Sequence, residues 1–96
     1  LLFTASVLAQ STTGVILGTI RDASGSVVPK AKVAVINAGT NARVETLSDD
    51  EGAYTAPLLP IGSYVVEVNA AGFRAYRQDG IRLQVNQQAR VDVTLT

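Results

Sequence analysis

Apolar and polar side chains alternate along several short runs in the second half of the chain. In these runs an apolar residue stands at every second position: Tyr64, Val66 and Val68; Ile81, Leu83 and Val85; and Val91, Val93 and Leu95. Side chains two residues apart lie on the same face of a β-strand. One apolar face and one polar face are typical of antiparallel sheets that bury one side and expose the other to water.

Turn-forming residues divide the chain from Val15 onward into short segments. The expected strands are 15–21, 32–37, 43–48, 53–56, 64–69, 81–85 and 90–95, and the more polar run 73–78 is an eighth if it also pairs. Pro57 is expected to end the fourth strand, because proline cannot donate to a ladder of hydrogen bonds. No segment shows a helical period. The spacing therefore predicts an all-β protein, a seven-stranded antiparallel β-sandwich.

The turns and one tyrosine carry more local expectations. Gly25, Gly52 and Gly62 follow or interrupt the predicted strands, where glycine supplies a positive φ without a steric cost. Tyr64 lies on the apolar face of its strand. Its ring is expected to pack in the core while its hydroxyl bonds to a turn, as in a tyrosine corner.

The first nine residues are apolar and then small, LLFTASVLA, and Gln10 follows. Val7 and Ala9 fit the small-residue pattern of a signal peptidase site after Ala9. We therefore expect residues 1–9 to be a truncated signal peptide remnant, 10–14 a short linker and 15–96 the folded domain. Polar residues from Gln10 onward interrupt the apolar run short of the ~20 residues that a membrane-spanning helix needs. The protein is predicted to be exported, and a bacterial envelope suits a chain without cysteine.

Composition excludes several function classes. The chain has 96 residues, enough for one domain, and a domain of this size rarely encloses a deep active site. Its eight basic and eight acidic residues give a net charge of zero, and the basic ones are scattered, unlike those of a nucleic-acid-binding surface. The absence of cysteine and histidine removes zinc sites, thiol catalysis and histidine-dependent triads. No cofactor is expected.

The acidic residues do not form a recognisable catalytic or metal site. Asp49, Asp50 and Glu51 precede Gly52, but three adjacent acids on a tight turn cannot supply the six to eight oxygens that calcium prefers. A solvated hairpin turn is the simpler interpretation. The remaining acids fall in turns or on predicted outward faces, so no carboxylate pair is expected in an apolar pocket. The prediction is that the protein has no catalytic residues and no metal site, and is not an enzyme.

Two kinds of binding remain open. A glycan site would use exposed aromatic faces, and Tyr54 and Tyr76 are the weak ligand-binding candidates, because Tyr64 and Phe73 are expected in the core. A protein partner would instead use a sheet edge, since unpaired edge strands accept a strand from another chain. The polar run 73–78 is the segment expected to form such an edge.

A set of turns and strand starts occurs in an order that is more specific than any one of them. The set consists of Gly18-Thr19-Ile20-Arg21-Asp22, Gly25, Val28-Pro29-Lys30-Ala31, Val33, Val35, Asn37, Asp49-Asp50-Glu51-Gly52-Ala53-Tyr54, Leu59-Pro60-Ile61-Gly62-Ser63-Tyr64 and Gly72-Phe73. In this order the segment from Gly18 to Phe73 resembles the carboxypeptidase regulatory-like domain. Leu47-Ser48 and Thr40-Asn41 depart from the family's usual residues, both near turns.

The resemblance implies a transthyretin (prealbumin)-like sandwich, which is also grouped with carbohydrate-binding-like folds. Such domains occur at the N-termini of TonB-dependent outer-membrane receptors, directly after the signal peptide. The implied function is a non-catalytic periplasmic extension that contacts a protein partner or neighbouring receptor domains. Membrane contact would then come only through a C-terminal barrel beyond this sequence. The alternative is a secreted carbohydrate-binding module.

Overall fold

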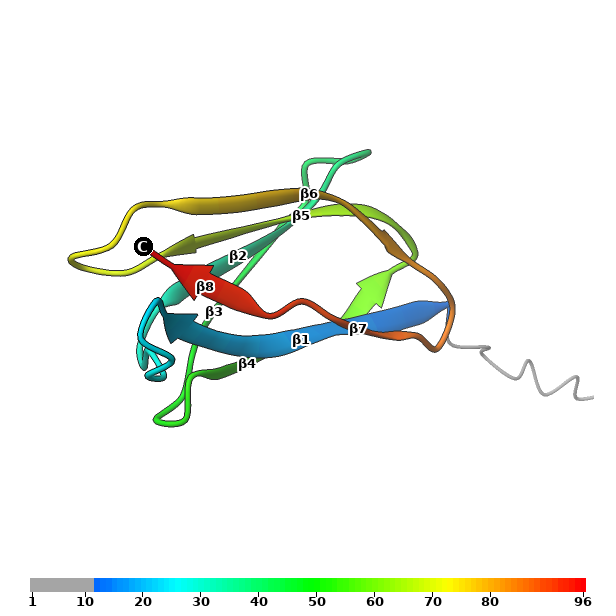
Figure 1. Ribbon diagram of the computed structural model, residues 1–96. Coiled ribbons are helices and arrows are strands. Elements are labelled where there is room, and N and C mark those ends of the chain that lie inside the picture. Colours follow the sequence, from blue (N-terminus) through cyan, green and yellow to red (C-terminus); the bar gives the residue numbers. More distant parts are fainter. Residues whose placement is uncertain (1–11) are drawn as a thin grey trace, which may run out of the picture.

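Two β-sheets pack face to face, and between them they contain eight strands (Figure 1). The structure is a computed structural model that describes residues 12–96. The strands are β1 (Thr13–Asp22), β2 (Lys32–Asn37), β3 (Arg43–Leu47), β4 (Ala53–Pro60), β5 (Gly62–Asn69), β6 (Tyr76–Leu83), β7 (Gln88–Arg90) and β8 (Val93–Leu95). One sheet has the order β4-β1-β7, with β8 also paired to β1, and the other has the order β3-β2-β5-β6. The predicted all-β sandwich is confirmed.

The strand boundaries in the last third of the chain differ from the prediction. Parts of the expected strands 73–78 and 81–85 form the single strand β6, from Tyr76 to Leu83, because the register against β5 shifts near Gly80, whose φ is 72°, without ending the pairing. The expected strand 90–95 is divided into β7 and β8. Both of these strands lie parallel to β1, so the sandwich is not purely antiparallel. The reason is that β6 ends beside the start of β1, and the chain then runs in the direction of β1.

Pro57 does not end the fourth strand. β4 continues to Pro60, and its register against β1 shifts between Gly14 and Ile16, opposite Pro57 and Leu58. β4 is at an edge of its sheet, where a residue without an N–H is tolerated. Leu58 has a φ of 57° in this bulge and is exposed.

The N-terminal strand begins earlier than expected. β1 starts at Thr13, so Thr13 and Gly14 belong to the sheet and not to the predicted linker. The carbonyl of Thr13 accepts a hydrogen bond from the N–H of Asn86. The predicted signal peptide remnant, residues 1–9, lies outside the described residues. From residue 12 to residue 96, no helix has the length and apolar character to cross a bilayer.

The core lies between the sheets and follows the predicted alternation except at Val85, which is exposed. Its largest fully buried side chains are Tyr64, Ile16, Ile20, Leu95, Val33, Val35, Val66, Val68 and Val93. Burying one such side chain fully contributes roughly 1.5–3 kcal/mol. The hydroxyl of Tyr64 donates to the carbonyl of Pro60, four residues earlier, so the expected corner tyrosine is present. Phe73 is only partly buried and packs against the margin of the core.

Asparagine or aspartate caps three of the turns. Asp22 accepts hydrogen bonds from the backbone N–H groups of Ser24 and Ser26, Asn37 from those of Gly39 and Thr40, and Asp49 from those of Glu51 and Ala53. Such bonds stabilise a turn locally. The hydrogen bond from the Ser24 hydroxyl is the main cause that lowers the pKa of Asp22, and the bonds from the backbone N–H groups act in the same direction.

The acidic segment is a turn but not a hairpin. β3 and β4 belong to different sheets, so residues 48–52 carry the chain across the sandwich. Gly52 has a φ of 75°, and a Cβ there would lie 2.6 Å from the carbonyl oxygen of Ile20. The turn therefore packs directly on β1, and sequence spacing alone could not reveal this contact.

Ser48 is a buried polar side chain at the start of this crossover. Its Oγ donates to the carbonyl of Val28 at 2.7 Å and accepts from the N–H of Ala31 at 2.8 Å. Ser48→Ala removes both bonds and leaves buried backbone groups unpaired, so we expect it to lower the free energy of unfolding by roughly 1–3 kcal/mol. Urea denaturation measures the change. The exposed Ser63→Ala is the control, and equal effects of the two variants would contradict the structural role of Ser48.

Candidate interaction surface

Tyr54 does not present an aromatic face to solvent, contrary to the sequence-based hypothesis. The side chain is 2% exposed, and its hydroxyl donates to the carbonyl of Val91. Burial raises the pKa of Tyr54 well above its ordinary value, and the nearby carboxylate of Asp92 acts in the same direction. Tyr54 and Ala56, two residues apart on β4, are both buried on the inner face of the strand. Tyr54 is therefore a core residue, and it cannot stack on a sugar.

Tyr76 lies at the start of β6 and is partly buried against the core. Its hydroxyl donates to the Oε1 of Gln78 at 2.7 Å. Tyr76 is close enough to Tyr54 to act electrostatically on it, but because Tyr54 is buried the two rings do not form an exposed binding platform. Of the two proposed glycan-binding residues, only Tyr76 retains accessible surface.

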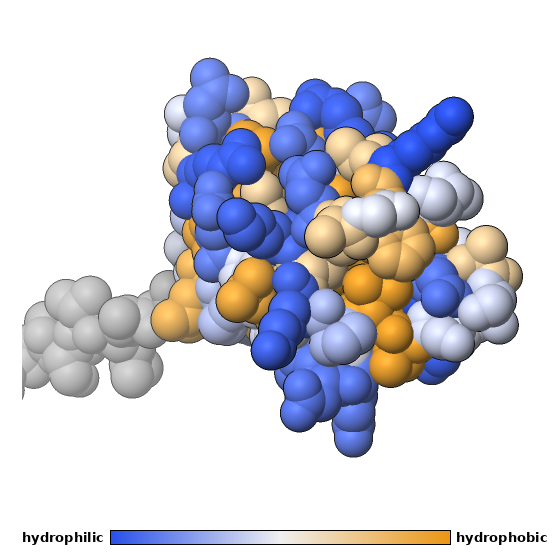
Figure 2. All heavy atoms as spheres, turned by 90° about the vertical axis from the view of Figure 1, so that its left-hand side faces the viewer, coloured by the Kyte–Doolittle hydropathy of each residue, from blue (hydrophilic) through white to orange (hydrophobic). Residues whose placement is uncertain are grey.

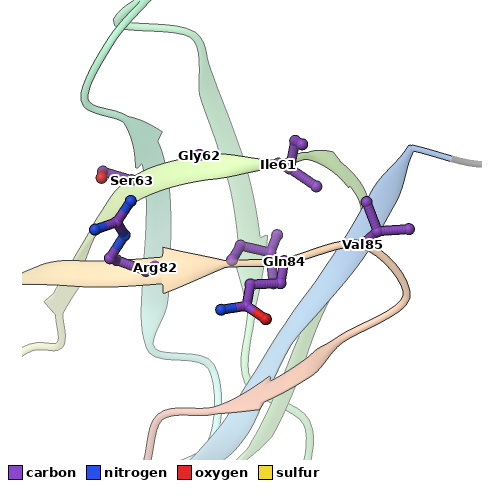
Figure 3. A pocket seen from close by; sticks show the side chains of 7 residues that line it. Ile61, Gly62, Ser63, Arg82, Gln84 and Val85 are labelled. Atoms are coloured by element: carbon purple, nitrogen blue, oxygen red, sulfur yellow. The ribbon is translucent and has the colours of Figure 1, made fainter.

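An open groove of about 750 Å³ lies at one end of the sandwich. Ile61, Gly62 and Ser63 line one side, and Arg82, Leu83, Gln84 and Val85 line the other. Figure 3 shows the two segments side by side, with Ile61 and Val85 at the same end of the groove. Gly62 pairs with Leu83 in the sheet, which fixes the distance between the two walls.

Each wall of the groove is held by local hydrogen bonds. Ile61 is the single residue between β4 and β5, and the bond from Tyr64 to Pro60 anchors this crossover. On the other wall, the N–H of Gln87 donates to the carbonyl of Gln84, and the N–H of Gln84 donates to the side-chain Oε1 of Gln87. The turn 84–87 is therefore ordered by its own residues, and it is joined to the first strand by bonds from Asn86 and Val15.

Two exposed aliphatic side chains, Ile61 and Val85, lie on the walls of this groove, and a third, Leu58, lies in the bulge of β4. We call them the apolar end. A second groove, of about 240 Å³, is lined by Leu58 and also by Asn86, Gln87 and Gln88. The turn after β6 therefore contributes residues to both grooves. Exposed apolar residues beside a groove are typical of contact surfaces.

The opposite end of the sandwich also exposes apolar residues among hydrophilic ones (Figure 2). The Asp22 turn lies at the far end of β1 from the groove (Figure 1). Seen from that end, the surface shows many hydrophilic residues with apolar ones between them (Figure 2). The described residues form three ion pairs, Arg43–Glu45, Arg77–Glu67 and Arg90–Asp92, and none of them includes a residue of the apolar end.

Sequence reasoning missed the apolar end for an identifiable reason. Val85 was expected to face inward with Ile81 and Leu83, but β6 ends at Leu83 and Val85 lies in a turn, 49% exposed. Leu58 and Ile61 occupied what was predicted to be a plain connection. The available signal was the run of apolar residues beside Pro57 and Pro60, where a connection is ordinarily polar.

The described part of the chain contains no group of three or more acidic, histidine or cysteine side chains placed to hold a metal ion. The groove instead combines the exposed aliphatic side chains of Ile61 and Val85 with the polar side chains of Ser63, Arg82 and Gln84.

Three comparisons place the chain among known proteins. The sequence pattern of the carboxypeptidase regulatory-like domain matches residues 15–96. The TonB-dependent transporter Oar of Myxococcus xanthus is 36% identical over 97 residues, an alignment that covers 99% of this chain and 9% of that protein. The chain thus spans less than a tenth of this relative.

Solved structures share the fold at low sequence identity. The Bacillus anthracis TIE protein superimposes with a TM-score of 0.75 and 20% identity, over 88% of this chain and 16% of that one. Catechol 1,2-dioxygenase of Acinetobacter radioresistens superimposes with a TM-score of 0.72 and 15% identity, over 90% and 52% of the two chains. Because such different proteins share the sandwich, the fold by itself does not specify a function.

Proposed function

The chain belongs to the carboxypeptidase regulatory-like domain family, and from this membership we propose that it is a non-catalytic interaction module of a TonB-dependent outer-membrane receptor. In this proposal the domain is the exported N-terminal extension of the receptor and lies in the periplasm. It binds no cofactor. Its partner is a neighbouring receptor domain or another periplasmic protein.

The observation that carries the proposal is the 36% identity to a TonB-dependent transporter along nearly the whole chain. The match covers a small part of that transporter, as expected for a module within a larger protein. The absence of histidine and cysteine from the sequence supports a non-catalytic role. The low-identity likeness to dioxygenases supports only a common fold.

We propose the apolar end as the surface that contacts the rest of the receptor. Ile61 and Val85 are about half exposed, at 47% and 49%, and belong to ordered turns, so little conformational freedom is lost when a partner covers them. Arg82 adds a charged group at the margin of the groove. An apolar centre with a polar margin is the usual anatomy of a protein–protein interface.

The receptor assignment is tested by reading the gene beyond the codon for Thr96. The expected continuation encodes a plug domain and long amphipathic strands. A stop codon directly after Thr96 would refute the assignment.

The contact surface is tested with the double variant Ile61→Ser, Val85→Ser. Removing two aliphatic side chains from the contact is expected to weaken binding of the 1–96 chain to the remainder of the receptor by about tenfold or more. Isothermal titration calorimetry measures the affinity. Leu47→Ser, another exposed aliphatic position remote from the groove, is the control. An unchanged affinity of the double variant, in protein that remains folded, would show that the contact lies elsewhere.

A further inference from the structure

The sandwich has four sheet edges, and three of them are irregular. β4 contains Pro57 and the bulge at Leu58, β6 contains the register shift at Gly80, and β7 and β8 are three residues each. Bulges, prolines and short strands prevent an edge from pairing with another chain. The fourth edge, β3, has no proline or glycine, and its register against β2 is continuous. It is therefore the edge best suited to accept a further strand.

The backbone groups that face away from β2 can be identified from the hydrogen bonds at both ends of the ladder. The N–H of Asn37 donates to the carbonyl of Ala42, and the N–H of Ser48 donates to that of Ala31. Hydrogen-bonded pairs alternate with non-bonded pairs in an antiparallel ladder. Val44 and Thr46 are thus bonded to β2, and the backbone groups of Arg43, Glu45 and Leu47 point outward.

We propose that β3 pairs with β3 of a second copy of this chain, antiparallel about a two-fold axis at Val44. In this register Arg43 lies opposite Glu45 of the second copy, and Glu45 lies opposite its Arg43. All four residues have outward-pointing backbone groups, so each opposed pair can exchange two hydrogen bonds. The two sheets join into one continuous sheet across the axis. This inference concerns a different surface from the apolar end and does not depend on the receptor assignment.

Charge selects this register over its neighbour. Arg43 and Glu45 lie on the same face of β3, and within one chain they form an exposed ion pair at 2.8 Å. In the proposed register opposite charges face each other twice across the new interface, and this favours pairing. A two-fold axis at Glu45 would instead place two glutamates directly opposite, and like charges in that position are destabilising.

Val44 supplies the apolar contact of the interface. It is 40% exposed, although its ladder partner Val35 is fully buried and points to the same side of the sheet. The opposite sheet therefore leaves part of Val44 uncovered. In the proposed register Val44 faces Val44 of the second copy as a non-bonded pair, with Cα atoms about 4.5 Å apart. The two side chains would cover each other's exposed surface.

Engineered cysteines test the register, because the chain has no cysteine of its own. Val44→Cys should form a symmetric disulfide-linked dimer under mild oxidation, since the expected Cα separation of about 4.5 Å suits a disulfide. Glu45→Cys is the matched control: in the proposed register the two thiols are diagonal, with Cα atoms about 7–8 Å apart. Equal cross-linking of the two variants, or faster cross-linking of Glu45→Cys, would overturn the register.

Charge exchange tests the interface without a covalent bond. Sedimentation velocity across a concentration series of the 1–96 chain should show dimer formation. Arg43→Glu and Glu45→Arg should each raise the dimer dissociation constant by about tenfold or more, and an equimolar mixture of the two should restore a mixed dimer. Arg77→Glu breaks an ion pair on the same face of the sheet but on β6, far from the β3 edge, and should leave dimerisation unchanged. A wild-type chain that stays monomeric throughout would refute the proposal.

Discussion

Replacing Gly18 with alanine is expected to lower the free energy of unfolding by roughly 3 kcal/mol or more, at the upper end of the range for overpacked sites. Gly18 lies in β1 where the last part of the chain crosses it. An alanine Cβ at this position would lie 1.9 Å from the carbonyl oxygen of Val91 and 2.6 Å from its carbonyl carbon. Backbone atoms occupy that space, so no rotamer change can relieve the contact.

The energetic reason for this close approach lies in the bonds around it. The N–H of Val91 donates to the carbonyl of Leu17 at 2.7 Å, and the carboxylate of Asp92 accepts from the N–H of Thr19 at 2.9 Å. The bond from Thr19 is the largest influence on Asp92 and lowers its pKa, with Arg90 acting in the same direction. These contacts span the gap between β7 and β8. A displacement caused by a Cβ at position 18 would break several of them together.

Thermal unfolding provides the measurement for Gly18→Ala. For a domain of this size, 3 kcal/mol corresponds to a fall in Tm of roughly 12–24 °C. The matched control is Gly39→Ala, because a Cβ at Gly39 meets no atom nearer than 3.4 Å. A Tm of Gly18→Ala within a few degrees of the control would mean that Val91 does not approach β1 as closely as described.

Replacing Tyr54 with alanine is expected to cost roughly 3–5 kcal/mol of stability, as for other buried aromatic side chains. The ring is almost completely buried, and its hydroxyl bonds to the same Val91 carbonyl that lies over Gly18. Tyr54→Phe separates the two contributions. It keeps the ring and removes the donor, so a loss of roughly 1–3 kcal/mol is expected.

Urea denaturation of both Tyr54 variants measures these losses, with Tyr76→Phe as the control. The hydroxyl of Tyr76 bonds to an exposed glutamine side chain, so its removal should change the free energy of unfolding by less than about 0.5 kcal/mol. If Tyr54→Phe were as harmless as Tyr76→Phe, the buried bond to Val91 would contribute nothing. A loss of glycan binding in Tyr54→Ala would therefore report unfolding, not a missing sugar contact.

Local pattern predicted well the features that depend on neighbouring residues. The alternation at Tyr64, Val66 and Val68 identified the buried face of β5, because side-chain direction in a strand changes at every residue. The turn at Asp49 to Gly52 was recognised because a short side-chain acceptor and a glycine stabilise turns through bonds within a few residues. The corner bond of Tyr64 spans only four residues.

The errors concern features that depend on distant residues. Tyr54 has the same alternating surroundings as an exposed tyrosine would have, and its burial depends on residues distant in the sequence, such as Val91, whose carbonyl accepts its hydrogen bond. Pro57 was assigned to a strand end, but the position of β4 at a sheet edge allows the strand to continue. Val85 continues the apolar alternation of Ile81 and Leu83, but Leu83 is the last residue of β6 that pairs with β5.

The sequence by itself therefore determined the fold class, the approximate strands, most inward faces and the family. All of these follow from short-range periodicity, turn chemistry and the order of motifs. Only the tertiary structure decided that β7 and β8 lie parallel to β1, that residues 48–52 cross between sheets, that Tyr54 belongs to the core, and that β3 is the regular edge. The physical reason is that a period of two residues records which face of a strand is buried, but contains no information about which strand lies beside it.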